Sequence, residues 1–197
     1  AEIQLTGSPY KRLTITERND APLADLVEPG DTTSTVEDLV IGTKLRLLAE
    51  SETTPAIAVR IATRLPNASE SSGIALDTTE FYASILAGKT IESVRVALNA
   101  GLGILPDPIL ASRQNDVLTY GLSLARALDE RLDVVGELNG RINTRGDEAP
   151  LGTESLSQFR AGLRYTIGSA RLDLGGIVGL TSRDPGIGFT AGFTYMF

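Results

Sequence analysis

The chain has 197 residues, 42% of them hydrophobic, and a formal net charge of −7 at pH 7. This acidic balance argues against nucleic acid as a partner. Cysteine and histidine are both absent, which excludes disulfides, thiolate metal sites and an imidazole base. We therefore expect a single domain over residues 1–197, with no metal and no cofactor.

Apolar and polar residues alternate with a period of two along most of the chain, which is typical of strands with one apolar face. In chain order this pattern predicts ten strands, at residues 10–17, 39–47, 57–65, 80–87, 93–104, 117–128, 132–143, 157–167, 170–181 and 189–197. The first nine residues are ambiguous. They either lengthen the first strand or form another strand before a turn at Gly7-Ser8-Pro9.

The last predicted strand carries the clearest pattern. Its odd positions are aromatic or small apolar residues, and its even positions are small and mostly polar. The aromatic positions include Phe193, Tyr195 and Phe197. A water-soluble protein rarely leaves such an edge exposed, because an unpaired flat edge invites aggregation. A strand whose apolar face meets lipid does not have this problem.

The connections between the predicted strands alternate in length. Short turns lie near residues 50–54, 88–92, 129–131 and 168–169, whereas longer loops lie at 18–35, 66–78, 105–115 and 144–155. The chain has no run of about 18 apolar residues, which a transmembrane helix would need. Only a β-barrel could therefore carry this chain across a bilayer. The fold class that we predict is all-β, an antiparallel up-and-down transmembrane β-barrel of about ten strands in the bacterial outer membrane, with both termini periplasmic.

A soluble β-sandwich or lipocalin-like barrel is the rival fold, in which the apolar faces would point inward. The aromatic face of the last strand and the unequal loops favour the membrane barrel, whose partner is the lipid bilayer.

If the apolar faces meet lipid, the polar faces line a lumen that is mostly basic. The first strand would add Arg12. The lumen-lining residues that we predict are Lys44, Arg46, Arg60, Arg64, Glu80, Arg95, Asn99, Glu137, Arg141, Arg160, Arg164, Arg171 and Asp173. One interpretation is a narrow channel for small anionic or polar solutes, because rings of arginine select anions. The other is a lumen plugged by paired charges, since small barrels are filled by side chains.

Catalysis is not expected. Acyl hydrolysis and proteolysis by outer-membrane barrels use a histidine base, and this chain has none. The glycine pairs Gly101-Leu102-Gly103 and Gly186-Ile187-Gly188 lie in or beside strands and are interpreted as small lumen residues rather than phosphate loops.

Several segments together resemble the outer-membrane barrel family of the MetA pathway of phenol degradation, a family of proposed transporters. The similarity runs from about residue 37 to the end. The matching segments are 37–44, the strand ending Arg64-Leu65-Pro66, 96–103, 134–140, 161–165 and the closing 192–197. The resemblance implies an outer-membrane location and uptake of hydrophobic or aromatic compounds. Family members are commonly longer at the N-terminus, so twelve strands are expected if early ones are missing.

The closing aromatic residues Phe193, Tyr195 and Phe197 also look like the recognition signal of the barrel-assembly machinery, which would then be a partner. The alternative to a channel is a structural or interaction barrel with a plugged lumen, which would bind a protein partner in an envelope assembly.

Overall fold

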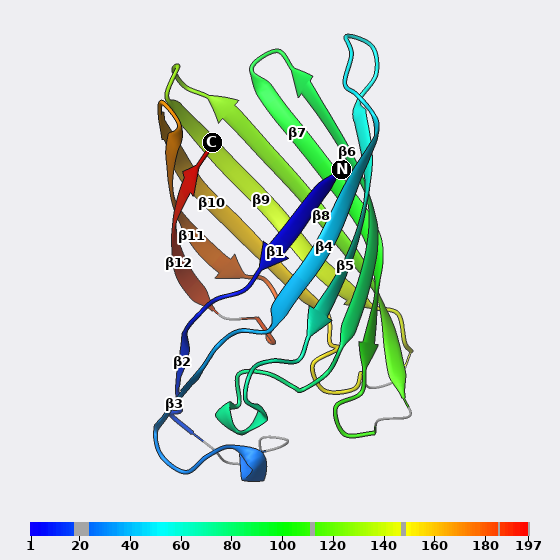
Figure 1. Cartoon of the computed structure of the whole chain (residues 1–197), viewed down its shortest axis with the longest axis vertical. Helices are drawn as coiled ribbons and strands as arrows, with labels where there is room; N and C mark the ends of the chain where they lie inside the picture. Colours follow the sequence, from blue (N-terminus) through cyan, green and yellow to red (C-terminus); the bar gives the residue numbers. More distant parts are fainter. Residues whose placement is uncertain (18–23, 111–112, 147–148, 185, 197) are drawn as a thin grey trace.

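The computed structural model describes residues 1–17, 24–110, 113–146, 149–184 and 186–196. It is an all-β structure built around one ten-stranded antiparallel sheet, with strand order β1-β4-β5-β6-β7-β8-β9-β10-β11-β12 (Figure 1). Its strands are β1 (Glu2–Thr6), β4 (Leu39–Leu48), β5 (Ala56–Leu65), β6 (Glu80–Ile91), β7 (Val94–Pro106), β8 (Gln114–Ala127), β9 (Leu132–Asn143), β10 (Leu156–Ile167), β11 (Ala170–Gly179) and β12 (Ile187–Tyr195).

The connection from β1 to β4 forms a small second sheet. It contains β2 (Lys11–Thr14) paired with β3 (Thr32–Thr35), and the 3-10 turn η1 (Ala24–Leu26) lies between them. A second 3-10 turn, η2 (Glu70–Ser72), follows β5. No helical membrane span is found in the described part of the chain.

The sheet is a meander in which each strand after β4 pairs with the next strand in the chain. Figure 1 shows it coiled, with β12 on one side, β8 and β9 behind, and β4 and β1 in front. Among the described residues no ladder joins β1 to β12, so these two strands are the edges of the sheet.

The prediction of ten antiparallel strands is confirmed, but the first strand was wrong. The sheet uses Glu2–Thr6, the alternative segment before Gly7-Ser8-Pro9, and not 10–17. Pro9 lacks a backbone N–H, and the chain leaves the sheet there. Residues Lys11–Thr14 pair instead with Thr32–Thr35, which lie inside the predicted loop 18–35. Arg12 is therefore outside the ten-stranded sheet.

The two ends of the sheet differ, as the loop lengths predicted. Tight connections at 92–93, 128–131 and 168–169 lie at the end that also holds both termini (Figure 1). The longer connections, together with β2, β3 and both 3-10 turns, lie at the opposite end. We call these the turn end and the loop end.

The described buried residues gather mostly at the loop end. Leu105 and Val117, on β7 and β8, are almost fully buried, and so are Asn115 and Thr153. Asn115 Nδ2 donates to Asn143 Oδ1 and to Thr153 Oγ1, each at 2.9 Å. The loops thus form a packed cap over this end of the sheet.

Asp38 joins two of the segments in this cap. Its Oδ1 accepts hydrogen bonds from the backbone N–H groups of Asn67, at 3.1 Å, and Ala68, at 3.0 Å. Asn67 Oδ1 in turn accepts from the N–H of Leu39 at 2.6 Å. The chain entering β4 is therefore held against the chain leaving β5.

Asp38→Ala should loosen this junction. The substitution leaves two backbone donors without their acceptor, one of them on buried Ala68, at a cost of about 1–3 kcal/mol. We expect faster amide exchange at residues 67 and 68 and a lower denaturation midpoint. Asp38→Asn keeps an acceptor oxygen and serves as the control, so equal losses in both variants would contradict this role.

Candidate functional site

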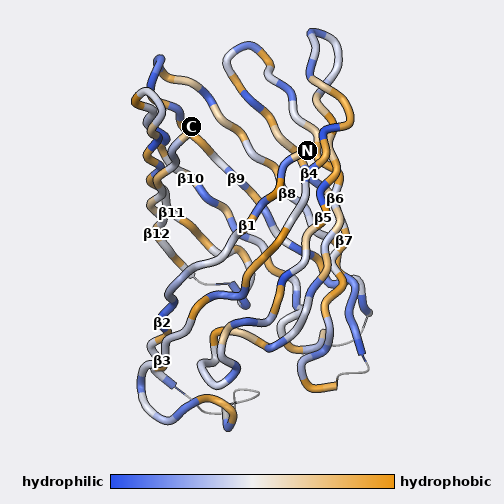
Figure 2. The backbone as a smooth tube through the Cα atoms, viewed as in Figure 1, coloured by the Kyte–Doolittle hydropathy of each residue, from blue (hydrophilic) through white to orange (hydrophobic). Residues whose placement is uncertain are grey.

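The register of the sheet places the predicted lumen residues on one face, except Arg12, which lies outside this sheet. Directly opposed pairs on this face include Lys44 with Arg60, Arg64 with Glu80, Glu137 with Arg160 and Arg164 with Asp173. The same face carries Arg46, Arg95, Asn99, Arg141 and Arg171. Polar and apolar residues alternate along the strands in Figure 2, so the other face is largely apolar.

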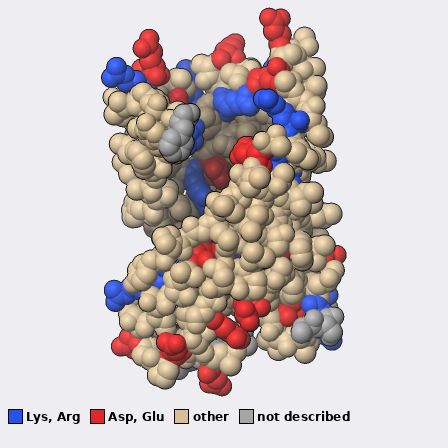
Figure 3. Space-filling model, viewed as in Figure 1, with Lys and Arg blue, Asp and Glu red and all other residues tan. Residues whose placement is uncertain are grey.

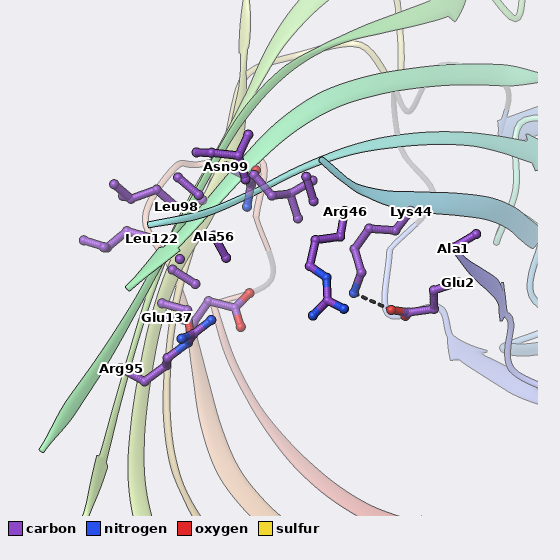
Figure 4. A pocket seen from close by; sticks show the side chains of 18 residues that line it. Ala1, Glu2, Lys44, Arg46, Ala56, Arg95, Leu98, Asn99, Leu122 and Glu137 are labelled. Atoms are coloured by element: carbon purple, nitrogen blue, oxygen red, sulfur yellow. Dashed lines mark ion pairs between the residues drawn. The ribbon is translucent and has the colours of Figure 1, made fainter. Parts of the chain in front are cut away.

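The polar face is the concave one. A cavity of about 680 Å³ lies against it, lined by residues from β1 and from β4 through β9. In Figure 4, Lys44 and Arg46 point into this cavity from one wall, facing Arg95 and Glu137 on the opposite wall, while Leu98 and Leu122 point away. Figure 3 shows charged side chains inside the hollow between the two edges of the sheet.

Ion pairs cross several strands on this face. Lys44 Nζ lies 2.5 Å from Glu2 Oε2, and Arg64 Nη1 lies 3.0 Å from Glu80 Oε1. Asp173 takes two partners, Arg164 Nε at 3.0 Å and Arg171 Nε at 3.1 Å. These contacts neutralise part of the positive charge and tie neighbouring strands together.

Other cations on the concave face have no carboxylate partner among the described residues. Arg60 Nε donates to Gln4 Oε1 at 2.8 Å, and Arg160 Nη2 donates to Gln158 Oε1 at 3.2 Å. Arg141 binds backbone carbonyls, donating to Glu154 O at 2.9 Å and to Gly152 O. Arg46 is exposed and lines the cavity. The concave face therefore remains net basic.

Glycines on this face make room for long side chains. A Cβ on Gly121 would lie 2.2 Å from Asn99 Nδ2, and one on Gly88 would lie 2.8 Å from Arg95 Nη2. These polar side chains therefore lie across neighbouring strands, which larger residues would prevent.

Two polar residues of this face were not predicted. Glu2 and Gln4 lie on β1, where they contact Lys44 and Arg60. The signal was present in the alternation Glu2-Ile3-Gln4-Leu5-Thr6, but the pattern at 10–17 was taken for the first strand.

The predicted assembly residues lie at the end of β12. Phe193 and Tyr195 are on the apolar face and are both more than half exposed, at 67% and 54%. Phe197 lies outside the described residues. The predicted recognition by an assembly machinery stays a prediction.

Searches against family models and against the curated proteins find no match for this chain. The resemblance to the phenol-degradation family therefore stays a prediction.

Asp107, at the loop end just after β7, offers a test of the cap that depends on pH. Its carboxylate accepts hydrogen bonds from the backbone N–H groups of Leu110, at 3.0 Å, and Ile109, at 2.9 Å. These bonds favour the charged form and hold the pKa of Asp107 below its ordinary value of 3.8. A lowered pKa contributes stability above the ordinary value, and this contribution is lost as the pH falls through the lowered pKa.

Asp107→Asn should therefore make stability less sensitive to acid. We expect the wild type to lose more stability than the variant between neutral pH and a pH below the ordinary pKa of aspartate, measured from denaturant midpoints. The other carboxylates titrate alike in both proteins and cancel in the comparison. Equal losses would show that Asp107 does not hold this loop.

Proposed function

We propose that the chain is an outer-membrane β-barrel, closed by the approach of β1 to β12, whose basic interior passes small anionic solutes. The observation that carries the proposal is the distribution of side chains between the two faces. Charged residues line the concave face, and large apolar residues cover the convex one.

The exposure of the apolar face is extensive. Phe189 is 90% exposed, and Ile61, Ile85 and Leu174 are each more than 60% exposed. The buried hydrophobic residues among those described are only Ala62, Ala68, Leu105 and Val117. A soluble sandwich or lipocalin-like barrel needs its large apolar residues inside, whereas a bilayer solvates them outside. This distribution of apolar side chains supports a barrel that lies in a membrane.

Aromatic residues of the convex face occur at two levels. Phe81, Phe159 and Phe189 lie towards the loop end of their strands, while Tyr165, Phe193 and Tyr195 lie towards the turn end. Aromatic girdles at both edges of an apolar band are a feature of outer-membrane barrels. Short turns on the side of both termini are a second such feature, which supports periplasmic termini.

The basic concave face supports the choice of solute. Arginines in a narrow passage attract anions and repel cations. The cavity near Lys44, Arg46 and Arg95 offers space for a small solute at the turn end.

A second candidate is supported by the ion pairs. Arg164, Arg171 and Asp173 form one cluster, and Arg64 pairs with Glu80, so part of the interior is internally neutralised. Ten strands are also close to the size at which side chains fill a barrel. In this version the barrel conducts nothing and serves as a structural element that binds a protein partner in an envelope assembly.

The membrane assignment can be tested with charges placed on opposite faces. Leu174, in the middle of β11, faces outward, so Leu174→Arg should cost about 2–4 kcal/mol of folding stability in a bilayer. Ser123→Arg on the concave face, opposite Glu137, is the control and should be tolerated. Unfolding titrations in lipid vesicles measure both. A Leu174→Arg variant that is stable and soluble without detergent would contradict the membrane proposal.

Transport can be tested by single-channel recording in planar bilayers. We expect discrete conductance with anion preference. Arg46→Ala or Arg60→Ala should weaken that preference several-fold, because a unit charge at contact distance in water is worth about 1 kcal/mol. Reversal potentials in a salt gradient measure the change.

Arg126→Ala is the matched control, since Arg126 pairs across from Val94 on the convex face. Its selectivity should equal that of the wild type. Membranes that stay silent although insertion is verified would remove the channel and leave the plugged barrel, which should then co-purify with a fixed partner.

A further inference from the structure

A second cavity, of about 520 Å³, lies within the loop cap. Its walls come from β2 and the residues after it, from η1 and η2 and the residues after each, and from the connections β7–β8, β9–β10 and β11–β12. Arg141 of β9 and Leu156 of β10 complete them. Figure 1 shows these segments gathered at the loop end of the sheet. No residue of the ion pairs described above for the concave face is in its lining.

The apolar part of the walls of this cap cavity is aliphatic. The apolar side chains lining it include Leu13, Ile15, Leu26, Val27, Leu76 and Leu151. No aromatic residue is among the described residues that line it. Volumes of about 300–1,000 Å³ are typical of ligand sites. The cavity therefore has the size and lining of a binding site.

Two glycines in left-handed conformations shape the walls. Gly73 has φ of 69°, and a Cβ there would lie 3.1 Å from Val27 Cγ2. Gly152 has φ of 79°, and a Cβ there would lie 2.0 Å from Leu76 Cδ1. Both positions combine a backbone that favours glycine with close packing. Three separate loops are thus brought together around the cavity.

The charges around the cavity nearly balance. The lining contains three carboxylates, Glu17, Glu70 and Glu154, and two guanidinium groups, Arg141 and Arg183. Arg141 already donates to the carbonyls of Gly152 and Glu154, so its guanidinium also holds the wall in place. Neither a strongly anionic nor a strongly cationic ligand is favoured by this set.

We propose that the cap cavity binds an uncharged, linear aliphatic molecule with a small hydrogen-bonding head, of the class of a medium-chain alkanol. Aliphatic walls suit an alkyl chain, and the described lining residues offer a planar ring no aromatic stacking partner. Carboxylate and guanidinium groups also line the cavity, and these can accept a hydrogen bond from the head or donate one to it. This site goes beyond the passage of anions, because most of its lining comes from the loops, and Arg141 is the one predicted lumen residue that it shares with the basic concave face.

The chain contains no cysteine, so single reporters can be placed in the cavity. Ala75→Cys and Ile15→Cys place a thiol on two different walls. The measurement is the rate of reaction with a small maleimide, on folded protein in lipid vesicles or plain buffer, with alkyl-chain detergents avoided. Octanol at about ten times its Kd leaves roughly one site in eleven free, so both reactions should slow about tenfold.

Octanoate, octylamine and phenol are the comparison ligands and should protect less than octanol. Asp31→Cys, an exposed position at the same end outside the cavity lining, is the control and should react at an unchanged rate. Absence of protection, equal protection by phenol, or equal slowing of Asp31→Cys would each overturn the proposal. The readout needs no conductance, so failure of the channel and failure of this site are separate results.

Discussion

The structure depends on one constraint, the antiparallel register of ten strands. Side chains alternate between faces with a period of two, so a slip of one residue in any ladder would move a whole strand's charges to the apolar side. The ladders from β4 to β12 are continuous except for an irregularity between Arg46 and Leu48. This register is what collects arginines from separate strands on one concave surface.

Contacts between side chains agree with that register. Arg64 and Glu80 are directly opposed on β5 and β6, and Arg164 and Asp173 are directly opposed on β10 and β11. Opposite charges in such positions favour the observed pairing over its neighbours, since like charges directly opposite each other are destabilising. Glycines elsewhere on the concave face leave room for polar side chains of the neighbouring strand, as Gly121 does for Asn99. Ion pairing and small residues therefore allow a crowded basic face, although they also reduce its free charge.

The two ends of the sheet carry different physical tasks. At the turn end, short connections leave the basic cavity open between β1 and the walls formed by β4 to β9. At the loop end, buried polar contacts such as those of Asp38 and Asn115 hold long connections together as a cap. Arg141 links the two regions, because it projects from the concave face and binds the carbonyls of the β9–β10 connection. The proposed passage and the proposed aliphatic site meet at this residue.

Periodicity predicted nine of the ten strands of the sheet, which of their residues share a face, and where the short turns fall, because alternation and turn chemistry are local properties. It could not decide between Glu2–Thr6 and Lys11–Thr14 as the first strand, since both alternate. Only the tertiary structure assigned β1 to β4 and β2 to β3. The cap cavity was likewise invisible, because Val27, Leu76 and Gly152 are distant in the chain and meet only through long-range packing. The alternation of a strand depends on its own residues. Which strand it pairs with, and which loops pack together, depend on contacts between residues far apart in the chain.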